Sequence, residues 1–174
     1  MPLIDLTYPQ DTFDDQSRSE LVERLTSTLL RLEGAPDNAS TRVMSRCFVH
    51  ELPAEHMYVA GQRYPEPTYR IVCTVPKGTL LHGPLGAFSR RELVKEMTQA
   101  ILDAEGTEYS DQDAGRIFCL IQEINDGFWG GMGEIFTMTD IVNFGAEEPA
   151  TDVARRAKAA LEQAAVELAK VSLE

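Results

Sequence analysis

The chain has 174 residues, of which 43% are hydrophobic, so a packed core is expected and the composition argues against disorder. The formal net charge of −12 gives an acidic surface that repels phosphate groups, which argues against nucleic acids and membrane surfaces as partners. A small anionic substrate would need a local group of arginine or lysine side chains.

The first expected element is a strand over residues 3–8, a short segment rich in β-forming residues. A helix is expected within residues 17–34, where apolar residues recur at helical spacing and Gly34 ends the pattern. The segment "TRVMSRCFVHEL" (41–52) is then expected to form a second strand.

The remainder of the chain repeats this pattern. "SRSELVERLTSTLLRLEG" (17–34) aligns with "SRRELVKEMTQAILDAEG" (89–106) at a shift of 72 residues, and the second strand aligns with "GRIFCLIQEI" at the same shift. The first strand aligns with "YRIVCTVP" (69–76) at a shift of 67. Tyr69 of the second copy therefore stands at the position that Pro2 holds in the first.

Each copy has the order β-α-β, and a crossover of this length makes its two strands parallel. We therefore predict an α+β fold in which two tandem β-α-β units form a four-stranded mixed sheet with two helices on one face. Residues 1–148 are expected to be a single domain of two repeats, 2–66 and 67–140. Residues 149–174 are expected to add a C-terminal helix that packs on the body or on a neighbouring subunit.

A β-α-β unit that begins Met-Pro and is duplicated in tandem resembles the tautomerase superfamily. In 4-oxalocrotonate tautomerase-like proteins, the second strand carries an Arg, then a Glu five residues later and a His ten residues later. "RCFVHELPAEHMYVAG" places Arg46, Glu51 and His56 at those offsets. Met57 stands where the family usually has an aromatic residue, and Phe118 replaces the arginine in the second copy.

The resemblance covers about residues 2–140 and extends to members with two fused units, including the malonate semialdehyde decarboxylase and cis-3-chloroacrylic acid dehalogenase groups. It implies an enzyme without a cofactor and a homotrimer of fused protomers. It also implies that Pro2 becomes the catalytic base once Met1 is removed, and that Arg46 is the catalytic residue that binds the substrate carboxylate.

Elementary chemistry is consistent with these two roles. An ordinary α-amino group titrates at roughly 7.7–8.0, and apolar surroundings with nearby guanidinium groups are expected to favour the neutral form of such an amine at Pro2. An amine that titrates near neutrality suits a 1,3-proton shift between an enol and a ketone. The Arg46 guanidinium matches a carboxylate through two parallel hydrogen bonds. A surface ion pair on the strand is the alternative for Arg46.

Seven further residues are candidates for substrate binding. Arg42 shares the expected strand face with Arg46, and Arg116, two residues before Phe118, could replace the arginine that is missing there. Tyr69 either offers a hydroxyl group to a carbonyl or packs in the core. The predicted substrate-binding residues are Arg42, Met57, Tyr69, Arg70, Lys77, Arg116 and Trp129.

Other candidates rest on the resemblance or on recurrence. Lys77 follows the third strand, near where the dehalogenase and decarboxylase relatives place arginines that bind carboxylates. Met57 and Trp129 are expected as apolar walls, with plain hairpin core as the alternative. Glu51 and Glu123 recur in both copies, and a structural role at the strand end explains this more simply than acid–base chemistry.

Compartment and metal content follow from what the sequence lacks. The first residues have no secretory signal pattern, and no apolar run reaches the roughly 20 residues needed to span a bilayer. Cys47, Cys73 and Cys119 have no C-x-x-C spacing, and the three histidines have no metal-ligand spacing. We expect a cytoplasmic protein with reduced thiols, no metal and no membrane partner.

The sequence leaves three functions open. The leading expectation is a tautomerase or isomerase of a small enol or keto carboxylic acid, with Pro2 as the base. A hydrolytic dehalogenase or decarboxylase would use the same pocket with a protonated Pro2. A non-catalytic trimeric binding protein is the third, and the departures at Met57 and Phe118 favour it.

Overall fold

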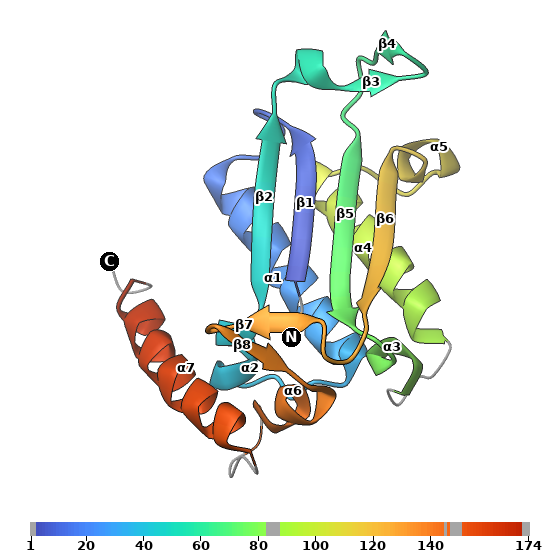
Figure 1. Ribbon diagram of the computed structural model, residues 1–174. Coiled ribbons are helices and arrows are strands. Elements are labelled where there is room, and N and C mark those ends of the chain that lie inside the picture. The colour runs from blue at the N-terminus through green and yellow to red at the C-terminus, as the bar shows by residue number, and fades with distance from the viewer. Residues whose placement is uncertain (1–2, 83–87, 145, 147–150, 172–174) are drawn as a thin grey trace.

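The structure is a computed structural model that describes residues 3–82, 88–144, 146 and 151–171. Its centre is a sheet of β1 (Leu3–Pro9), β2 (Arg46–Leu52), β5 (Tyr69–Pro76) and β6 (Ile117–Ile124), in the order β2-β1-β5-β6 (Figure 1). β1 and β2 are parallel, β5 and β6 are parallel, and β1 pairs antiparallel with β5. The predicted four-stranded mixed sheet is confirmed.

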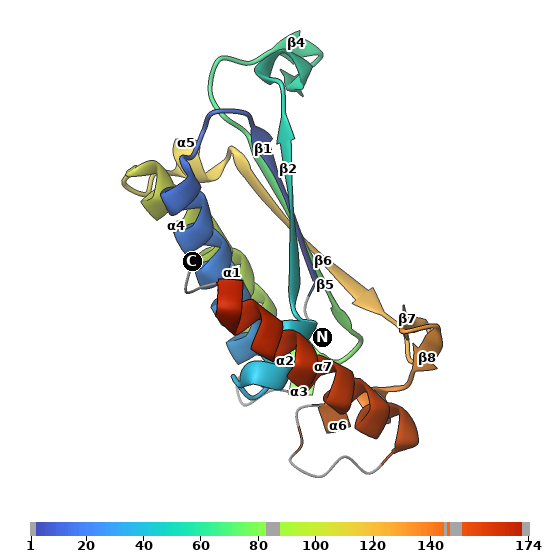
Figure 2. The same cartoon turned by 90° about the vertical axis from the view of Figure 1, so that its left-hand side faces the viewer.

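Two long helices, α1 (Asp15–Glu33) and α4 (Phe88–Glu105), cover the same face of the sheet, as predicted (Figure 2). Each turns an apolar stripe towards the strands, and the equivalent residues Leu25 and Met97 are fully buried. Gly34 ends α1 in the left-handed conformation, with φ at 72°, which a glycine adopts without steric cost. The hydrophobic core lies between this helix pair and the sheet.

Strand register confirms the alignment of the two copies. Leu3 lies opposite Arg46 in the first pair of parallel strands, and Arg70 lies opposite Phe118 in the second. The first-strand residues differ by 67 and the second-strand residues by 72, as in the sequence alignment. Tyr69, one residue before Arg70, is therefore the structural counterpart of the residue before Leu3.

The recurring glutamates tie each helix to its second strand. Arg18 at the start of α1 donates to Glu51 over 3.0 Å, and Arg90 at the start of α4 donates to Glu123 over 3.1 Å. The four residues obey the shift of 72, so both copies contain the same ion pair. Tyr8 also donates to Glu51, over 2.9 Å. These contacts support the structural interpretation of the two glutamates.

The second strand is shorter than predicted. Residues 41–44 belong to a helix, α2 (Ala39–Met44), and β2 begins only at Arg46. A capping box causes this, because the Asn38 side chain accepts from the Thr41 backbone amide and the Thr41 hydroxyl accepts from the Asn38 amide. The expectation that 41–52 is one strand was wrong, since the apolar residues of 41–44 serve a helix turn.

The remaining elements lie between the two repeats, within the second repeat or after it, and all of them are short except α7. They are η1 (Ala54–His56), β3 (Tyr58–Val59), β4 (Gln62–Arg63), α3 (Thr79–His82), α5 (Asp111–Ala114), β7 (Trp129–Gly131), β8 (Glu134–Phe136), α6 (Met138–Phe144) and α7 (Asp152–Val171). The hairpin β3–β4 lies at one end of the sheet, and the hairpin β7–β8 lies at the other, beside the start of β1 (Figure 1). The predicted C-terminal helix is present as α7.

A second apolar cluster joins β8, α6 and α7. The Phe136 and Phe144 rings meet edge to face at 5.0 Å, and Ala154 and Ala157 are buried against them. Met44 of α2 packs on the same cluster, so α7 is attached to the first repeat as well as to the second. This places the C-terminal helix at the end of the sheet where β1 begins.

The face of the sheet opposite α1 and α4 carries apolar side chains that this chain leaves exposed. Phe48 is 51% exposed, Phe118 63% and Leu120 48%. Such a patch is typical of a surface that contacts another molecule. None of the helices described is long and apolar enough to cross a membrane.

Candidate functional site

A cavity of about 520 Å³ lies where β1 and β2 begin and where β5 and β6 end. Strands, a hairpin and two helices contribute to it, and most of its wall is apolar. Its lining residues are Leu3, Met44, Arg46, Phe48, Thr74, Ile124, Phe128, Trp129, Gly130, Gly131, Met132, Phe136, Ala157 and Leu161. Arg46 is the only charged residue among them.

The floor of the cavity follows from strand register. Leu3 lies opposite Arg46 on one side and opposite Thr74 on the other. Side chains alternate along a strand, so these three point to the face that α1 and α4 leave open, while Ile4 points into the core. Phe48, two residues after Arg46, extends the same face.

The β7–β8 hairpin forms one wall and requires a glycine. A Cβ atom at Gly131 would lie 2.6 Å from the Phe136 ring, closer than nonbonded carbon atoms approach. Gly131 therefore lets Phe136 fold back beneath the hairpin, which leaves Trp129 and Met132 along the cavity. The hairpin sequence "GFWGGMGE" thus builds an apolar wall.

Within the part of the chain that the structure describes, the Arg46 guanidinium has no acidic partner. Its Nη1 donates to the Ser45 carbonyl over 3.0 Å and to the Val43 carbonyl, both at the C-terminal end of α2. These bonds orient the group and leave Nε and Nη2 without a partner among the described residues. In an acidic chain, an unpaired arginine in an apolar cavity is suited to binding an anion.

Pro2 lies outside the described residues. Leu3, the next residue, is the first that the structure describes, and it lines the cavity beside Arg46. The proposed roles of Pro2 and Arg46 therefore remain predictions, although the described part of β1 leads to the same cavity.

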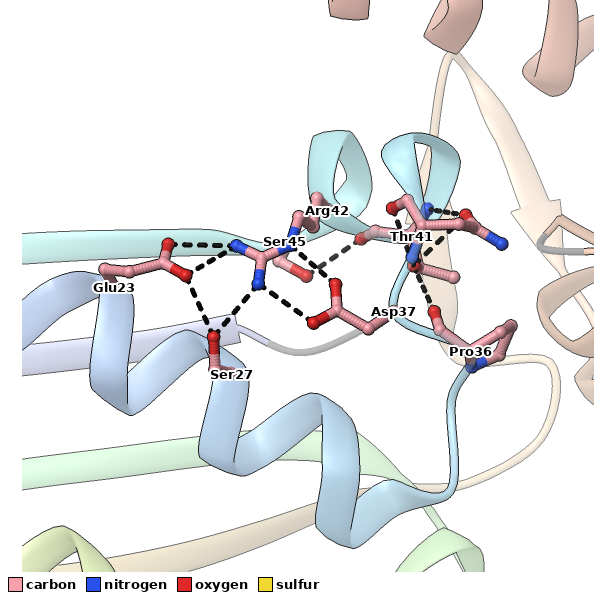
Figure 3. A network of polar contacts seen from close by, with 8 residues as sticks. Glu23, Ser27, Pro36, Asp37, Thr41, Arg42 and Ser45 are labelled. Carbon is pink, nitrogen blue, oxygen red and sulfur yellow. Dashed lines mark hydrogen bonds and ion pairs between the residues drawn. The ribbon is translucent and has the colours of Figure 1, made fainter.

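Arg42 does not share a strand face with Arg46. It lies on α2, where its guanidinium binds Glu23 over 2.7 Å, Asp37 over 2.9 Å and Ser27 over 3.0 Å (Figure 3). The two carboxylates raise the pKa of Arg42, so its positive charge is committed to holding α2 against α1. The expected common face was wrong because residues 39–44 are helical.

Arg116 and Tyr69 lie at the opposite end of the sheet. Arg116 binds Glu105 through two bonds of 3.0 and 2.8 Å, and it donates to the Pro67 carbonyl over 2.8 Å. The Tyr69 hydroxyl also donates to Glu105, and burial together with that carboxylate raises the pKa of Tyr69. Arg116 precedes β6 and is buried, whereas Phe118 is exposed, so Arg116 does not replace the missing arginine.

The other predicted residues also lie away from the cavity wall. Met57 belongs to the connection at the far end of the sheet, and Arg70 is exposed on β5 opposite Thr7. Lys77 donates to Asn125 over 3.1 Å. Among the predicted residues that the structure describes, only Arg46 and Trp129 line the cavity.

Several lining residues were missed by the sequence analysis. Phe128 and Met132 flank Trp129 in the hairpin, and their position next to a predicted wall residue was a usable signal. Ala157 and Leu161 come from α7, and nothing in the sequence of that helix showed which end of the sheet it covers. Within the described residues, no group of three or more His, Cys, Asp or Glu side chains is arranged to hold a metal ion.

The first repeat matches a known protein family. Residues 2–65 match the family model described as tautomerase enzyme. A search of curated proteins finds no match. The family match therefore covers the first repeat, including Arg46.

Solved structures match both repeats. N1, a member of the cis-3-chloroacrylic acid dehalogenase family, is 15% identical with a TM-score of 0.67, and the match covers 92% of this chain and 99% of N1. A native fused 4-OT is 21% identical, with a TM-score of 0.60 over 76% of this chain and 94% of that chain. F6 fused 4-OT, a wild-type asymmetric trimer, is 18% identical, with a TM-score of 0.60 over the same shares. At these identities the likeness establishes the fold.

Proposed function

We propose that this chain, a member of the tautomerase superfamily by its first repeat and its fold, is a cofactor-independent tautomerase of small enol or keto carboxylic acids. One observation carries the proposal: among the described residues, Arg46 is the only charged one that lines the apolar cavity, and it has no acidic partner. The cavity adjoins Leu3, one residue after the proposed base.

The chemistry needs only this chain's own groups. Once Met1 is removed, the secondary amine of Pro2 takes a proton from the substrate enol or from its α-carbon and returns one at the other position. Apolar surroundings favour the neutral amine, since they disfavour the ammonium form. A base that titrates near the working pH is effective in both halves of a proton shift.

Arg46 and the apolar walls contact different parts of the substrate. The free Nε and Nη2 groups of Arg46 hold the carboxylate, which places the neighbouring carbonyl or enol near the start of β1. Trp129, Phe128 and Leu161 contact the remainder of the molecule. A single cation in an apolar cavity favours a monocarboxylic acid with an apolar substituent over a dicarboxylic acid.

The proposal includes a homotrimer. Its support is the exposed apolar face of the sheet with Phe48, Phe118 and Leu120, and the trimeric state named for F6 fused 4-OT. Burial of those side chains in an assembly would remove a large apolar patch from water. Sedimentation of the purified chain measures this directly.

The deciding experiment compares the processed chain with Pro2→Ala. Intact mass first establishes that Met1 is absent, and ultraviolet absorbance then follows ketonisation of an arylenolpyruvate. We expect the wild type to accelerate the conversion and Pro2→Ala to lose that acceleration. Equal rates for the two proteins contradict the proposed base, and no acceleration by either favours a non-catalytic binding protein.

A hydrolytic dehalogenase or decarboxylase is the second candidate. The match to N1, which spans 92% of this chain, favours it. Addition of water needs a carboxylate or a phenol to direct the water molecule, and the described cavity wall contains neither. Release of chloride from 3-chloroacrylate by the wild type, with no enol ketonisation, would replace the tautomerase proposal.

A further inference from the structure

The C-terminal helix α7 supplies two residues of the cavity wall, Ala157 and Leu161. They lie four residues apart, so both are on the same side of the helix. On that side, nearer the start of α7, Ala154 is fully buried in the apolar cluster with Phe136 and Phe144. The first half of α7 is therefore packed on the body, and its packed face continues into the cavity wall.

A buried carboxylate fixes the start of α7. Asp140 of α6 is 7% exposed, and it accepts from the Thr137 amide over 2.9 Å and from the Thr137 hydroxyl over 2.7 Å. It also accepts from the Thr151 hydroxyl over 2.7 Å, and the Thr151 oxygen accepts from the Ala154 amide over 3.0 Å. Thr151 therefore caps the helix while it is bound to Asp140. Since Thr137 directly follows β8, the Asp140 side chain links the β7–β8 hairpin, α6 and α7.

The other contacts of α7 constrain it less. Arg156 donates to Glu134 of β8 over 3.0 Å, but both side chains are about half exposed, and an exposed ion pair contributes little. The helix also packs along α2 (Figure 2), whereas Val166 and Val171 in its second half are exposed. The position of α7 beside the cavity therefore depends mainly on the Asp140 network and on the apolar cluster.

The size of the cavity indicates which ligands would reach the α7 wall. A volume of about 520 Å³ lies in the range of pockets that enclose drug-sized molecules. A three-carbon acid held by Arg46 would leave most of this space to water, which finds few polar partners on an apolar wall. An acid with a longer apolar group would extend from Arg46 along that wall and remove apolar surface from water on both molecules.

We propose that α7 determines the specificity of the site: Leu161 selects carboxylic acids that carry an apolar chain of several carbons or an aromatic ring, and Asp140 is the positioning residue that holds α7 beside the cavity. The inference rests on the proposed function in one respect, that the ligand is an acid bound by Arg46. The identity of the base does not enter it. α7 also lies outside the residues that match the family model, so this selection is a property of the present chain.

Trp129 makes the selection measurable without any reaction. It is the only tryptophan of the sequence and it lines the cavity, so its fluorescence reports on a bound ligand. Titration with propanoate, hexanoate and 3-phenylpropanoate, which have no enol to convert, should show affinity rising about fourfold for each methylene group that is buried. Equal affinities of propanoate and hexanoate, or no response to any of the three acids, overturn the inference even if Pro2 is the base. An active Pro2→Ala overturns the proposed function alone.

The role of the helix is tested by Leu161→Ala. We expect the affinity for hexanoate to fall about tenfold and the affinity for propanoate to stay unchanged, because only the longer chain reaches the α7 wall. Val166→Ala is the matched control, since it shortens an exposed side chain of the same helix and should leave both affinities at the wild-type values. An unchanged ratio of the two affinities in Leu161→Ala overturns the assignment of specificity to α7.

The role of Asp140 is tested by Asp140→Asn, which keeps the shape of the side chain and leaves one acceptor oxygen for the bonds to Thr137 and Thr151. We expect the affinity for hexanoate to fall several-fold, because α7 loses its anchor, and the affinity for propanoate to remain. Asp152→Asn is the matched control, the same change at an exposed position in the first turn of α7.

A second pair of variants keeps this test decisive if Asp140→Asn fails to fold. Thr151→Val removes the hydroxyl group that binds Asp140 and should lower the ratio of the hexanoate affinity to the propanoate affinity. Thr151→Ser keeps the hydroxyl group and should restore the wild-type ratio. An equal loss for both acids in Thr151→Val, or no loss for either, would mean that Asp140 supports the fold alone, and the positioning role would be overturned.

Discussion

The two ends of the sheet are formed by equivalent parts of the two repeats, and they differ in what their buried carboxyl groups bind. At the far end, Glu105 is held by Arg116 and Tyr69. At the near end, the Glu33 carboxylate has no hydrogen-bond partner among the described residues, Met44 stands in place of the arginine, and a cavity with Arg46 lies beside the start of β1. Both repeats keep the same β-α-β frame, whereas the cavity with Arg46 lies at the near end.

The difference separates the parts of the repeat that hold the fold together from the parts that line the cavity. The helix-to-strand ion pairs, Arg18 with Glu51 and Arg90 with Glu123, are present in both copies and hold the frame. An amine at a chain terminus cannot be copied into the middle of a chain, so the second repeat has no counterpart of the proposed base at Pro2. A tyrosine at that place donates a hydrogen bond to the Glu105 carboxylate.

The largest effect is expected when the ion pair of Glu105 at the far end of the sheet is removed. Arg116→Met leaves Glu105 buried without its cation, and we expect the free energy of unfolding to fall by about 3–5 kcal/mol. The kcat/KM of the folded fraction should stay at the wild-type value, because Arg116 lies at the opposite end from the cavity. Urea denaturation measures the first quantity, and Arg91→Met, on the exposed side of α4, is the control. A catalytic defect without loss of stability would reverse the assignment of the two ends.

Removing the unpaired carboxyl group should act in the opposite direction. The folded-state pKa of Glu33, about 7, exceeds its ordinary value of 4.5, so the folded state binds the proton more tightly than the unfolded state. Stability from this group is therefore full below pH 4.5 and is lost as the pH rises through 7, by up to about 3 kcal/mol. We expect Glu33→Gln to be more stable than the wild type at pH 8 and equal to it at pH 4.

Glu105→Gln sharpens the same contrast, because it should lower stability at pH 8 by leaving Arg116 without its main partner. Both variants are measured by urea denaturation at the two pH values. A wild-type stability that does not fall between pH 5 and 8, relative to Glu33→Gln, would mean that Glu33 is paired in solution.

The next largest effect is a loss of kcat/KM at the near end of the sheet, where the cavity lies. Arg46→Ala removes the one charged side chain among the described residues of the cavity wall, and we expect kcat/KM to fall about 100-fold, the loss of one charge-assisted carboxylate contact. Arg46→Lys should recover only part of this, because an ammonium cannot offer two parallel donors. Steady-state kinetics with a neutral ester of the substrate provides the control, since it should be indifferent to Arg46. An equal loss with acid and ester would assign Arg46 to structure.

The sheet and the repeat could be predicted from the sequence because both produce regular patterns in it. A shift of 72 residues with matched apolar positions fixed two parallel crossovers, and the observed register agrees with it. It failed at residues 41–44, where the capping box of Asn38 and Thr41 prevailed over β-forming composition. That local error misplaced Arg42, because one helical turn rotates a side chain away from the strand face.

The site was only partly predictable for a related reason. Arg46 and Trp129 follow from motif positions, whereas Arg116 has the same residue type as Arg46 and a different task, decided by its partner Glu105. Contacts between elements far apart in the chain, such as those of α7 with α2, leave no periodic pattern in the sequence. The pairing state of Glu33 could be seen only when both repeats were placed in space.

The smallest expected effect concerns the β7–β8 hairpin, which forms one wall of the cavity. In Gly131→Ala the new methyl group meets the Phe136 ring at 2.6 Å, so the ring and the hairpin must shift. We expect the free energy of unfolding to fall by about 1–2 kcal/mol, in the range for overpacking, and the KM for an apolar acid to rise several-fold. Gly130→Ala is the matched control for stability, since its nearest contact would be an ordinary 3.7 Å. Equal stability of the two variants would show that the hairpin is too loose to act as a wall, and substrate selection would then rest on Arg46 and α7.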